Sequence, residues 1–123
     1  HHLDIDKAYA EIARVLRPGG RAVFVEPLGL NPAIELYRRL TPSARTPDEH
    51  PLMRQDFRRF SAAFGTTSCR FYGLSTLAVV PFRRSAAKAP LFNVTRALDR
   101  GLFALPGLKW LAWYSLMEGV AAA

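Results

Sequence analysis

Cysteine is almost absent from this sequence of 123 residues, in which Cys69 is the only one. A single cysteine cannot form a disulfide bond within the chain, so a fold held by internal disulfides is excluded and a reducing, cytoplasmic location is expected. Long apolar runs are also missing, since none reaches the roughly 18 residues that a membrane-spanning helix needs. The sequence therefore does not predict an integral membrane protein.

Acidic residues are in the minority, with 10 Asp and Glu against 17 Lys and Arg, which gives a net charge of +7. The excess is greatest between Arg83 and Lys109, where Asp99 is the only acid. The basic residues of this stretch are Arg83, Arg84, Lys88, Arg96, Arg100 and Lys109. Such a concentration suits an anionic partner, a membrane surface or only a solvated face, and the sequence leaves these alternatives open.

Several motifs that would define a site are lacking. No G-x-G-x-x-G occurs, and Gly19-Gly20 follow a helical pattern and precede an apolar run, which is typical of a helix end rather than of a phosphate-binding loop. The histidines lack the spacing of metal ligands, so no metal site is predicted. Trp110, Trp113 and Tyr114 accompany basic residues, but without a nucleic-acid-binding signature, so no nucleic-acid partner is predicted.

What is present is the composition of one folded domain, with 50% hydrophobic and 22% charged residues. Apolar residues recur at three- and four-residue spacing from Asp4 to Leu16, which predicts an amphipathic helix. Asp4 or Asp6 can accept hydrogen bonds from the first turn of this helix. The Pro-Gly-Gly at residues 18–20 ends the helix, because proline disfavours helical geometry in the residue before it.

A short apolar run, Ala22–Val25, follows directly and ends at Glu26. Its residues do not alternate with polar ones, which predicts a strand covered by helices on both faces, as in a parallel α/β sheet. Open α/β sheets place their ligand crevice at the carboxyl ends of such strands. A carboxylate at that position is costly to bury without a partner, so Glu26 is a candidate binding or catalytic residue.

The rest of the chain alternates helical and extended patterns. Further helices are predicted at Pro32–Leu40, with Asn31 as N-cap, and at Pro51–Phe64, separated by a proline-containing loop at residues 41–50. A strand is predicted at Thr66–Tyr72. Short helices at Leu74–Pro81 and Pro90–Ala104 follow, and Ala112–Glu118 suits either a closing strand or a last helical turn.

A leucine-rich stripe runs along the predicted helix at residues 90–104. Its members are Leu91, Val94, Leu98, Leu102 and Leu105, with Arg96 and Arg100 between them. Leucines at this spacing most often belong to a core, but the same pattern suits a lid over an apolar substrate or a helix that docks on a membrane surface. All three interpretations remain open from the sequence.

The segment from His1 to Pro27 resembles the class I methyltransferases that use S-adenosylmethionine. In that family a histidine-containing segment follows the fourth strand, a helix ends in V-L-R-P-G-G or V-L-K-P-G-G, and the fifth strand follows at once; here the run is Val15-Leu16-Arg17-Pro18-Gly19-Gly20. Residues 31–52 are similar to a bacterial subgroup of small-molecule methyltransferases. The resemblance is specific over residues 1–27 and weaker to about residue 80.

The resemblance implies that this chain is the C-terminal half of a Rossmann-like sheet. Arg21–Glu26 would be its fifth strand and Thr66–Tyr72 its sixth, with the last strand, antiparallel between them, at Ala112–Glu118. Residues 1–72 would then form a helix–strand core, residues 73–111 a helical insertion, and residues 112–118 the closing strand. An alternative places the last strand at Ser75–Val80.

The resemblance also implies a site. His1, His2 and Leu3 would border the S-adenosylmethionine cofactor, while Glu26, Asn31, Arg45 and His50 would face the substrate. His2, Glu26 and His50 are candidates for a general base. The family's glycine-rich cofactor loop has no counterpart in this sequence, so the chain is expected to be a fragment that binds the cofactor weakly.

The functional expectation is therefore methyl transfer to a small acceptor, which the apolar and basic stretch at residues 83–109 suggests is apolar or lipid-like. The isolated chain is expected to be inactive and only marginally stable, with exposed apolar faces and one free sheet edge. The alternative is a non-enzymatic module that docks on a membrane surface or on another protein through residues 83–109.

Overall fold

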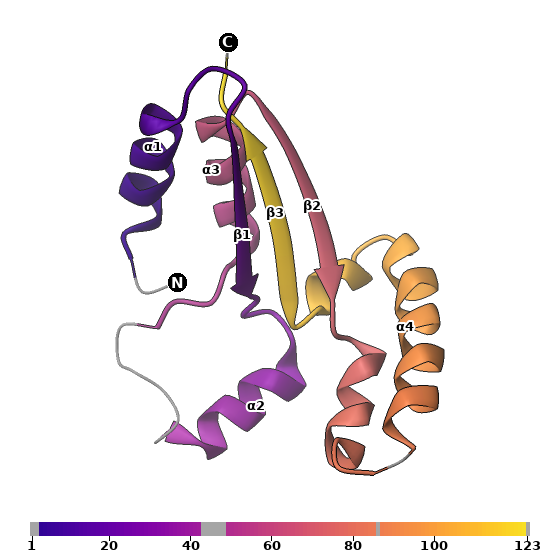
Figure 1. Ribbon diagram of the computed structural model, residues 1–123. Helices are drawn as coiled ribbons and strands as arrows, with labels where there is room; N and C mark the ends of the chain where they lie inside the picture. The colour runs from indigo at the N-terminus through magenta and orange to yellow at the C-terminus, as the bar shows by residue number, and fades with distance from the viewer. Residues whose placement is uncertain (1–2, 43–48, 86, 123) are drawn as a thin grey trace.

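The computed structural model of the protein describes residues 3–42, 49–85 and 87–122. Its centre is a three-stranded sheet made of β1 (Arg21–Pro27), β2 (Thr66–Tyr72) and β3 (Tyr114–Val120). The spatial order is β1-β3-β2, so the strand that comes last in the sequence lies in the middle (Figure 1). Helices complete a mixed α/β fold.

Both outer strands run antiparallel to β3. Arg21 lies opposite Val120 in one pair, and Thr66 lies opposite the same residue in the other. As a result, β1 and β2 run in the same direction, with β3 between them. The strand predicted at residues 22–25 is present, but the parallel pairing predicted for it is wrong within the described residues, since the sheet there contains only antiparallel pairs.

The prediction that helices cover this strand on both faces is also wrong. Ala22 and Phe24 point toward the helices, whereas Val23 and Val25 are 60% and 61% exposed on the other face. The reason is that α1 (Ile5–Val15) and α3 (Arg54–Ala63) pack against each other and against the same side of the sheet (Figure 1). β1 is also an edge strand of the described sheet rather than an interior one.

The first turns of α1 and α2 are capped as the sequence predicts, whereas α3 differs at its start. The side chain of Asp4 accepts a hydrogen bond from the Lys7 N–H at 3.2 Å at the start of α1. Helix α2 (Pro32–Leu40) begins with proline after the N-cap Asn31. Helix α3 begins later than predicted, at Arg54, where Asp56 accepts from the Met53 N–H at 2.7 Å.

Residues 73–111 are largely helical, as predicted. They form the 3-10 helix η2 (Ser75–Phe82), the α-helix α4 (Lys88–Ala104) and the 3-10 helix η3 (Leu108–Leu111). The alternative of a last strand at residues 75–80 is therefore wrong. The closing strand predicted at residues 112–118 forms as β3, which starts two residues later, so a last helical turn there is wrong as well.

Aromatic rings fill the space between the helices and the sheet. Phe60 is fully buried and contacts Tyr9 and Phe24 edge-on, with ring centroids 5.2 and 5.5 Å apart. Its neighbour Phe64 lies 4.9 Å away. This cluster holds α1, α3 and β1 together and fixes the helix-covered face of the sheet.

The leucine-rich stripe of α4 does not form part of this core. Val94 is 67% exposed, and Leu98 and Leu105 are also exposed. The residues that α4 buries are instead Thr95 and Asp99, which face η2. The core interpretation of the stripe is thus wrong, because the helix packs on η2 through its polar side.

Gly119 provides a test of the packing between β3 and the aromatic cluster. A Cβ added there would lie only 2.6 Å from Cγ of Phe64, so we expect Gly119→Ala to lower the free energy of unfolding by about 1–3 kcal/mol in urea denaturation. Gly101→Ala is the matched control, since no atom lies within 4 Å of its Cβ position in α4. It should be neutral or stabilising by about 0.5–1 kcal/mol. Equal midpoints for both variants would contradict the packing described.

Candidate functional site

The candidate site lies at the carboxyl end of β1. Side chains alternate along this strand, so Glu26 points to the same face as Ala22 and Phe24. There it lines a small cavity of about 80 Å³ together with Leu3, Tyr9 and Leu52. Glu26 thus borders a cavity on an edge strand, and its predicted binding or catalytic role stays a prediction.

The segment before α3 is fastened to this end of the strand. The Leu52 N–H donates to the Pro27 carbonyl at 2.8 Å, and the Gly29 N–H donates to the Leu52 carbonyl at 3.1 Å. These bonds form an isolated parallel bridge between Leu28 and Leu52. They bring the segment that contains His50 next to the cavity that Glu26 lines.

His50 lies beside a buried carboxylate. Its Nε2 lies 3.6 Å from Oδ2 of Asp56, and Asp56 is fully buried while the imidazole is about half exposed. The same carboxylate accepts from the Met53 N–H and pairs with Arg59. At this distance the two groups are near neighbours without a hydrogen bond between them.

Tyr9 lies at the back of the same cavity. Its pKa is raised above the ordinary value, first by burial and then by the negative charges of Glu26 and Asp56. The phenol therefore keeps its proton at neutral pH and can serve as a hydrogen-bond donor but not as a base. The helical periodicity of residues 4–16 gives no signal for Tyr9, because the charges that act on it, those of Glu26 and Asp56, belong to other segments of the chain.

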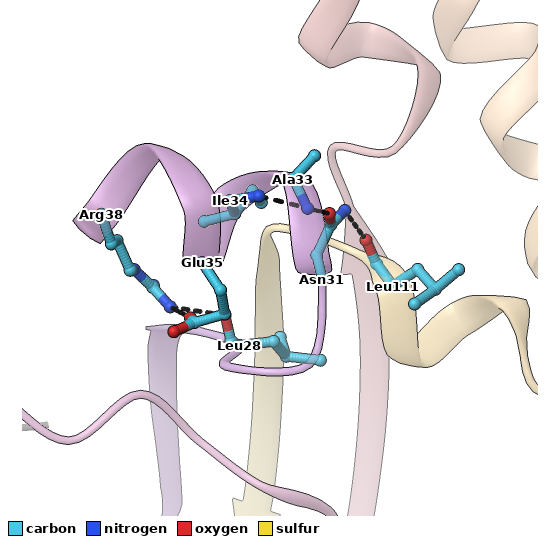
Figure 2. Close-up of polar contacts among 7 residues, drawn as sticks. All are labelled: Leu28, Asn31, Ala33, Ile34, Glu35, Arg38 and Leu111. Atoms are coloured by element: carbon cyan, nitrogen blue, oxygen red, sulfur yellow. Dashed lines mark hydrogen bonds and ion pairs between the residues drawn. The ribbon is translucent and has the colours of Figure 1, made fainter. Parts of the chain in front are cut away.

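The side chain of Asn31 is hydrogen-bonded within the protein at the start of α2 (Figure 2). Its Oδ1 accepts from the N–H groups of Ala33 and Ile34, at 3.0 and 3.4 Å, and its Nδ2 donates to the Leu111 carbonyl at 2.5 Å. The amide thus caps α2 and ties it to η3. Its predicted role in facing a substrate stays a prediction, and the residue is buried among these partners.

Helix α2 is held by a second contact that the sequence did not suggest. Arg38 is buried and donates from Nη1 to the Leu28 carbonyl at 3.2 Å, and it also pairs with Glu35 (Figure 2). Sequence analysis would place this arginine on the solvent face of α2. Arg38 thus ties α2 to Leu28, at the start of the turn between β1 and α2, and Asn31 caps the helix at the end of that turn.

The structure brings together only some of the predicted site residues. Leu3 and Glu26 share one cavity and His50 lies in the adjacent segment, whereas His1, His2 and Arg45 lie outside the described residues. Among the described residues, no three His, Cys, Asp or Glu side chains gather as metal ligands would. For a cofactor, this cavity offers the apolar side chain of Leu3 and the carboxylate of Glu26.

A larger pocket, of about 710 Å³, lies away from this site, between the end of β2, η2 and α4. It is lined by basic and aromatic side chains, among them Arg70, Arg96, Arg100, Tyr72, Phe92 and Trp113. The sequence gives no signal for this grouping, because its members come from three separate segments, at residues 70–77, 92–100 and 113–114, that only the fold brings together.

No protein-family model matches the sequence, and a search of curated proteins finds no significant match. Within residues 3–42, 49–85 and 87–122, no helix has the length and apolar character needed to cross a bilayer.

Proposed function

We propose that this chain is part of an S-adenosylmethionine-dependent methyltransferase that acts on a small acceptor. In this proposal β1, β2 and β3 correspond to the fifth, sixth and last strands of a Rossmann-like sheet. The supporting observation is the strand order: β3 runs antiparallel between two strands that point the same way. The helix that precedes β1 and ends in Pro-Gly-Gly adds to this support.

The place of β1 at the edge of the described sheet, and its exposed valines, are consistent with the same proposal. Among the described strands, β1 pairs only with β3 and is therefore an edge strand. The proposal assigns the edge away from β3 to a neighbouring strand that this sequence does not contain. Val23 and Val25, exposed here, would then be shielded by the rest of the domain.

The chemistry requires little beyond alignment. S-adenosylmethionine supplies an activated methyl group, so the protein has to orient the acceptor in line and remove a proton where the accepting atom carries one. Glu26 in its cavity and His50 beside Asp56 are the candidates for that base, with His2 as the further candidate. His1, His2 and Leu3 would border the cofactor, and Asn31 and Arg45 the acceptor.

Calorimetry with S-adenosylmethionine provides a first test. Because the glycine-rich loop is missing from this sequence, the 123-residue chain should bind the cofactor weakly or not at all. Micromolar affinity would contradict the assignment of this chain as the half without the cofactor loop.

Transfer of a radiolabelled methyl group is the decisive test, with the full product of the gene that encodes this chain and a small-molecule extract as acceptor. Glu26→Gln should lower the rate about 100-fold or more if Glu26 is the base. Glu11→Gln, which removes an exposed carboxylate from α1, is the matched control and should leave the rate unchanged. Failure of the wild-type protein to label any acceptor would overturn the proposed function.

The second candidate function, docking on a membrane surface, is favoured by the surface of η2 and α4. Apolar side chains that are exposed there include Val80, Phe82, Val94, Leu98 and Leu105. Arg83 and Arg84 follow η2, Lys88 is the first residue of α4, and all three are exposed as well. Exposed apolar residues beside unpaired cations are the pattern of a segment that binds the interface of an anionic membrane.

Sedimentation with anionic vesicles tests this second function. We expect the chain to bind vesicles that contain phosphatidylserine and to dissociate as salt rises, since exposed charges are screened. The triple substitution R83Q/R84Q/K88Q should reduce binding, by about 1 kcal/mol per charge lost. Binding that is equal on neutral vesicles would contradict the membrane-docking function.

A further inference from the structure

We propose that the pocket between β2, η2 and α4 binds a small anionic amphiphile, a carboxylate or phosphate monoester with an apolar body. The inference names no reaction and stands independently of methyl transfer. The pocket has a volume of about 710 Å³, which is within the range of small-ligand pockets. The ligand class follows from the two kinds of side chain that line it.

One wall of the pocket comes from α4. Phe92, Arg96 and Arg100 follow one another at four-residue spacing, so they lie on the same face of the helix. Two guanidinium groups one turn apart can bind one carboxylate or phosphate from adjacent positions. This wall therefore supplies positive charge beside an aromatic ring.

The opposite wall comes from β2. Arg70 and Tyr72 are two residues apart on this strand, so both point to the face that the core helices do not cover. Arg70 brings a third positive charge to the pocket, and Tyr72 lies opposite Tyr114 of β3. Charge and aromatic surface are thus present on both walls.

The floor of the pocket is fixed. The Trp113 N–H donates to the carbonyls of Tyr72 and Gly73, at 3.0 and 2.9 Å, and the indole lies 5.2 Å from the ring of Tyr114. Gly73 has a φ of +83°, and a Cβ there would lie 3.0 Å from Cβ of Trp113. A rigid aromatic floor loses little entropy when an apolar ligand packs on it.

The pocket carries more positive than negative charge, since its lining holds three guanidinium groups and one carboxylate. Among the described residues, no carboxylate pairs with Arg70, Arg96 or Arg100. Asp99 is the one acid in the lining, and both of its oxygens accept hydrogen bonds from Ser75 and Thr76 instead. Three unpaired guanidinium groups beside exposed aromatic rings select an anion with an apolar body.

The test measures ligand binding to the 123-residue chain by calorimetry below the micellar concentration of each ligand. Dodecyl phosphate should bind with one molecule per chain. Dodecyl maltoside has the same tail without the charge, and inorganic phosphate has the charge without the tail, and each should bind at least about 10-fold more weakly. Equal affinity for dodecyl maltoside, or for inorganic phosphate, would overturn the inference.

Two charge-matched variants locate the site. R96Q/R100Q should lower the affinity for dodecyl phosphate about 10-fold or more, because it removes the paired guanidinium groups. R83Q/R84Q removes the same net charge outside the pocket lining and should change the affinity less than about 2-fold. Equal losses in the two variants would overturn the inference in favour of general attraction by the basic surface.

A final comparison separates a free ligand from a lipid headgroup. Vesicles that contain phosphatidate present the same phosphate in a bilayer. Binding of monomeric dodecyl phosphate that is weakened by R96Q/R100Q supports a site for a free amphiphile. Binding to vesicles alone, or displacement by a single-stranded oligonucleotide with equal affinity, would contradict it.

Discussion

Replacing Phe60 with alanine is expected to lower the free energy of unfolding by about 3–5 kcal/mol, the largest effect of any single substitution proposed for this chain. Phe60 is 0% exposed and contacts Tyr9, Phe24 and Phe64, so its removal leaves a cavity at the point where two helices meet the sheet. Urea denaturation followed by circular dichroism measures the loss.

Two further variants keep this prediction testable. Phe82→Ala removes the same ring from a largely exposed position in η2 and should cost about 1 kcal/mol or less. Phe60→Leu retains an apolar side chain of similar volume and should cost about 1–2 kcal/mol, so it gives a value even if the alanine variant does not fold. A Phe60→Ala midpoint equal to that of Phe82→Ala would contradict the described core.

The second large effect is expected at Asp99. Its carboxylate accepts five hydrogen bonds, from the N–H groups of Leu74, Ser75 and Thr76 and from the two hydroxyls. We expect Asp99→Ala to cost about 2–4 kcal/mol, because these donors lose a charged acceptor at the start of η2. Amide hydrogen exchange at residues 74–76 should quicken more than exchange in β3.

The effect should depend on pH in a defined direction. Burial favours the neutral form of Asp99, but hydrogen bonds from Ser75, Leu74 and Thr76 outweigh it and hold the pKa below its ordinary value of 3.8. A lowered pKa in the folded state means that the ionised carboxylate contributes stability above about pH 4, and that this contribution is lost as pH falls through the folded pKa.

Asp99→Asn separates this effect from packing. The difference in unfolding free energy between wild type and Asp99→Asn should be largest near pH 7 and should shrink toward pH 3. Asp6→Asn, which alters an exposed acid in α1, is the matched control and should change the stability by less than about 0.5 kcal/mol. A difference between wild type and Asp99→Asn that is constant from pH 7 to pH 3 would contradict the role of the charge.

Local signals in the sequence were sufficient to predict most elements. The Pro-Gly-Gly at residues 18–20 placed the end of α1 and the start of β1, and Asn31-Pro32 placed the start of α2. These signals act within a few residues and depend on backbone geometry alone. Burial was less predictable, since the apolar run at residues 22–25 reads the same whether one or both of its faces are covered.

The candidate site was predictable only in part. The sequence indicates Glu26 as a candidate, because open α/β sheets bind their ligands at the carboxyl ends of their strands. Tyr9 and Asp56 were missed, because each matters through a residue from a different element. Arg96 and Arg100 of the larger pocket belong to the basic stretch at residues 83–109, but nothing in the sequence predicts that Arg70 lies beside them.

The central place of β3 has a consequence for how the chain folds during synthesis. β1 and β2 are synthesised before residues 114–120, and among the described strands neither has a partner until β3 is made. Pairs such as Arg21 with Val120 join the two ends of the chain, and contacts of such long sequence separation form slowly. We therefore expect these three strands to pair late in synthesis, after the edges of β1 and β2 have been open to other chains.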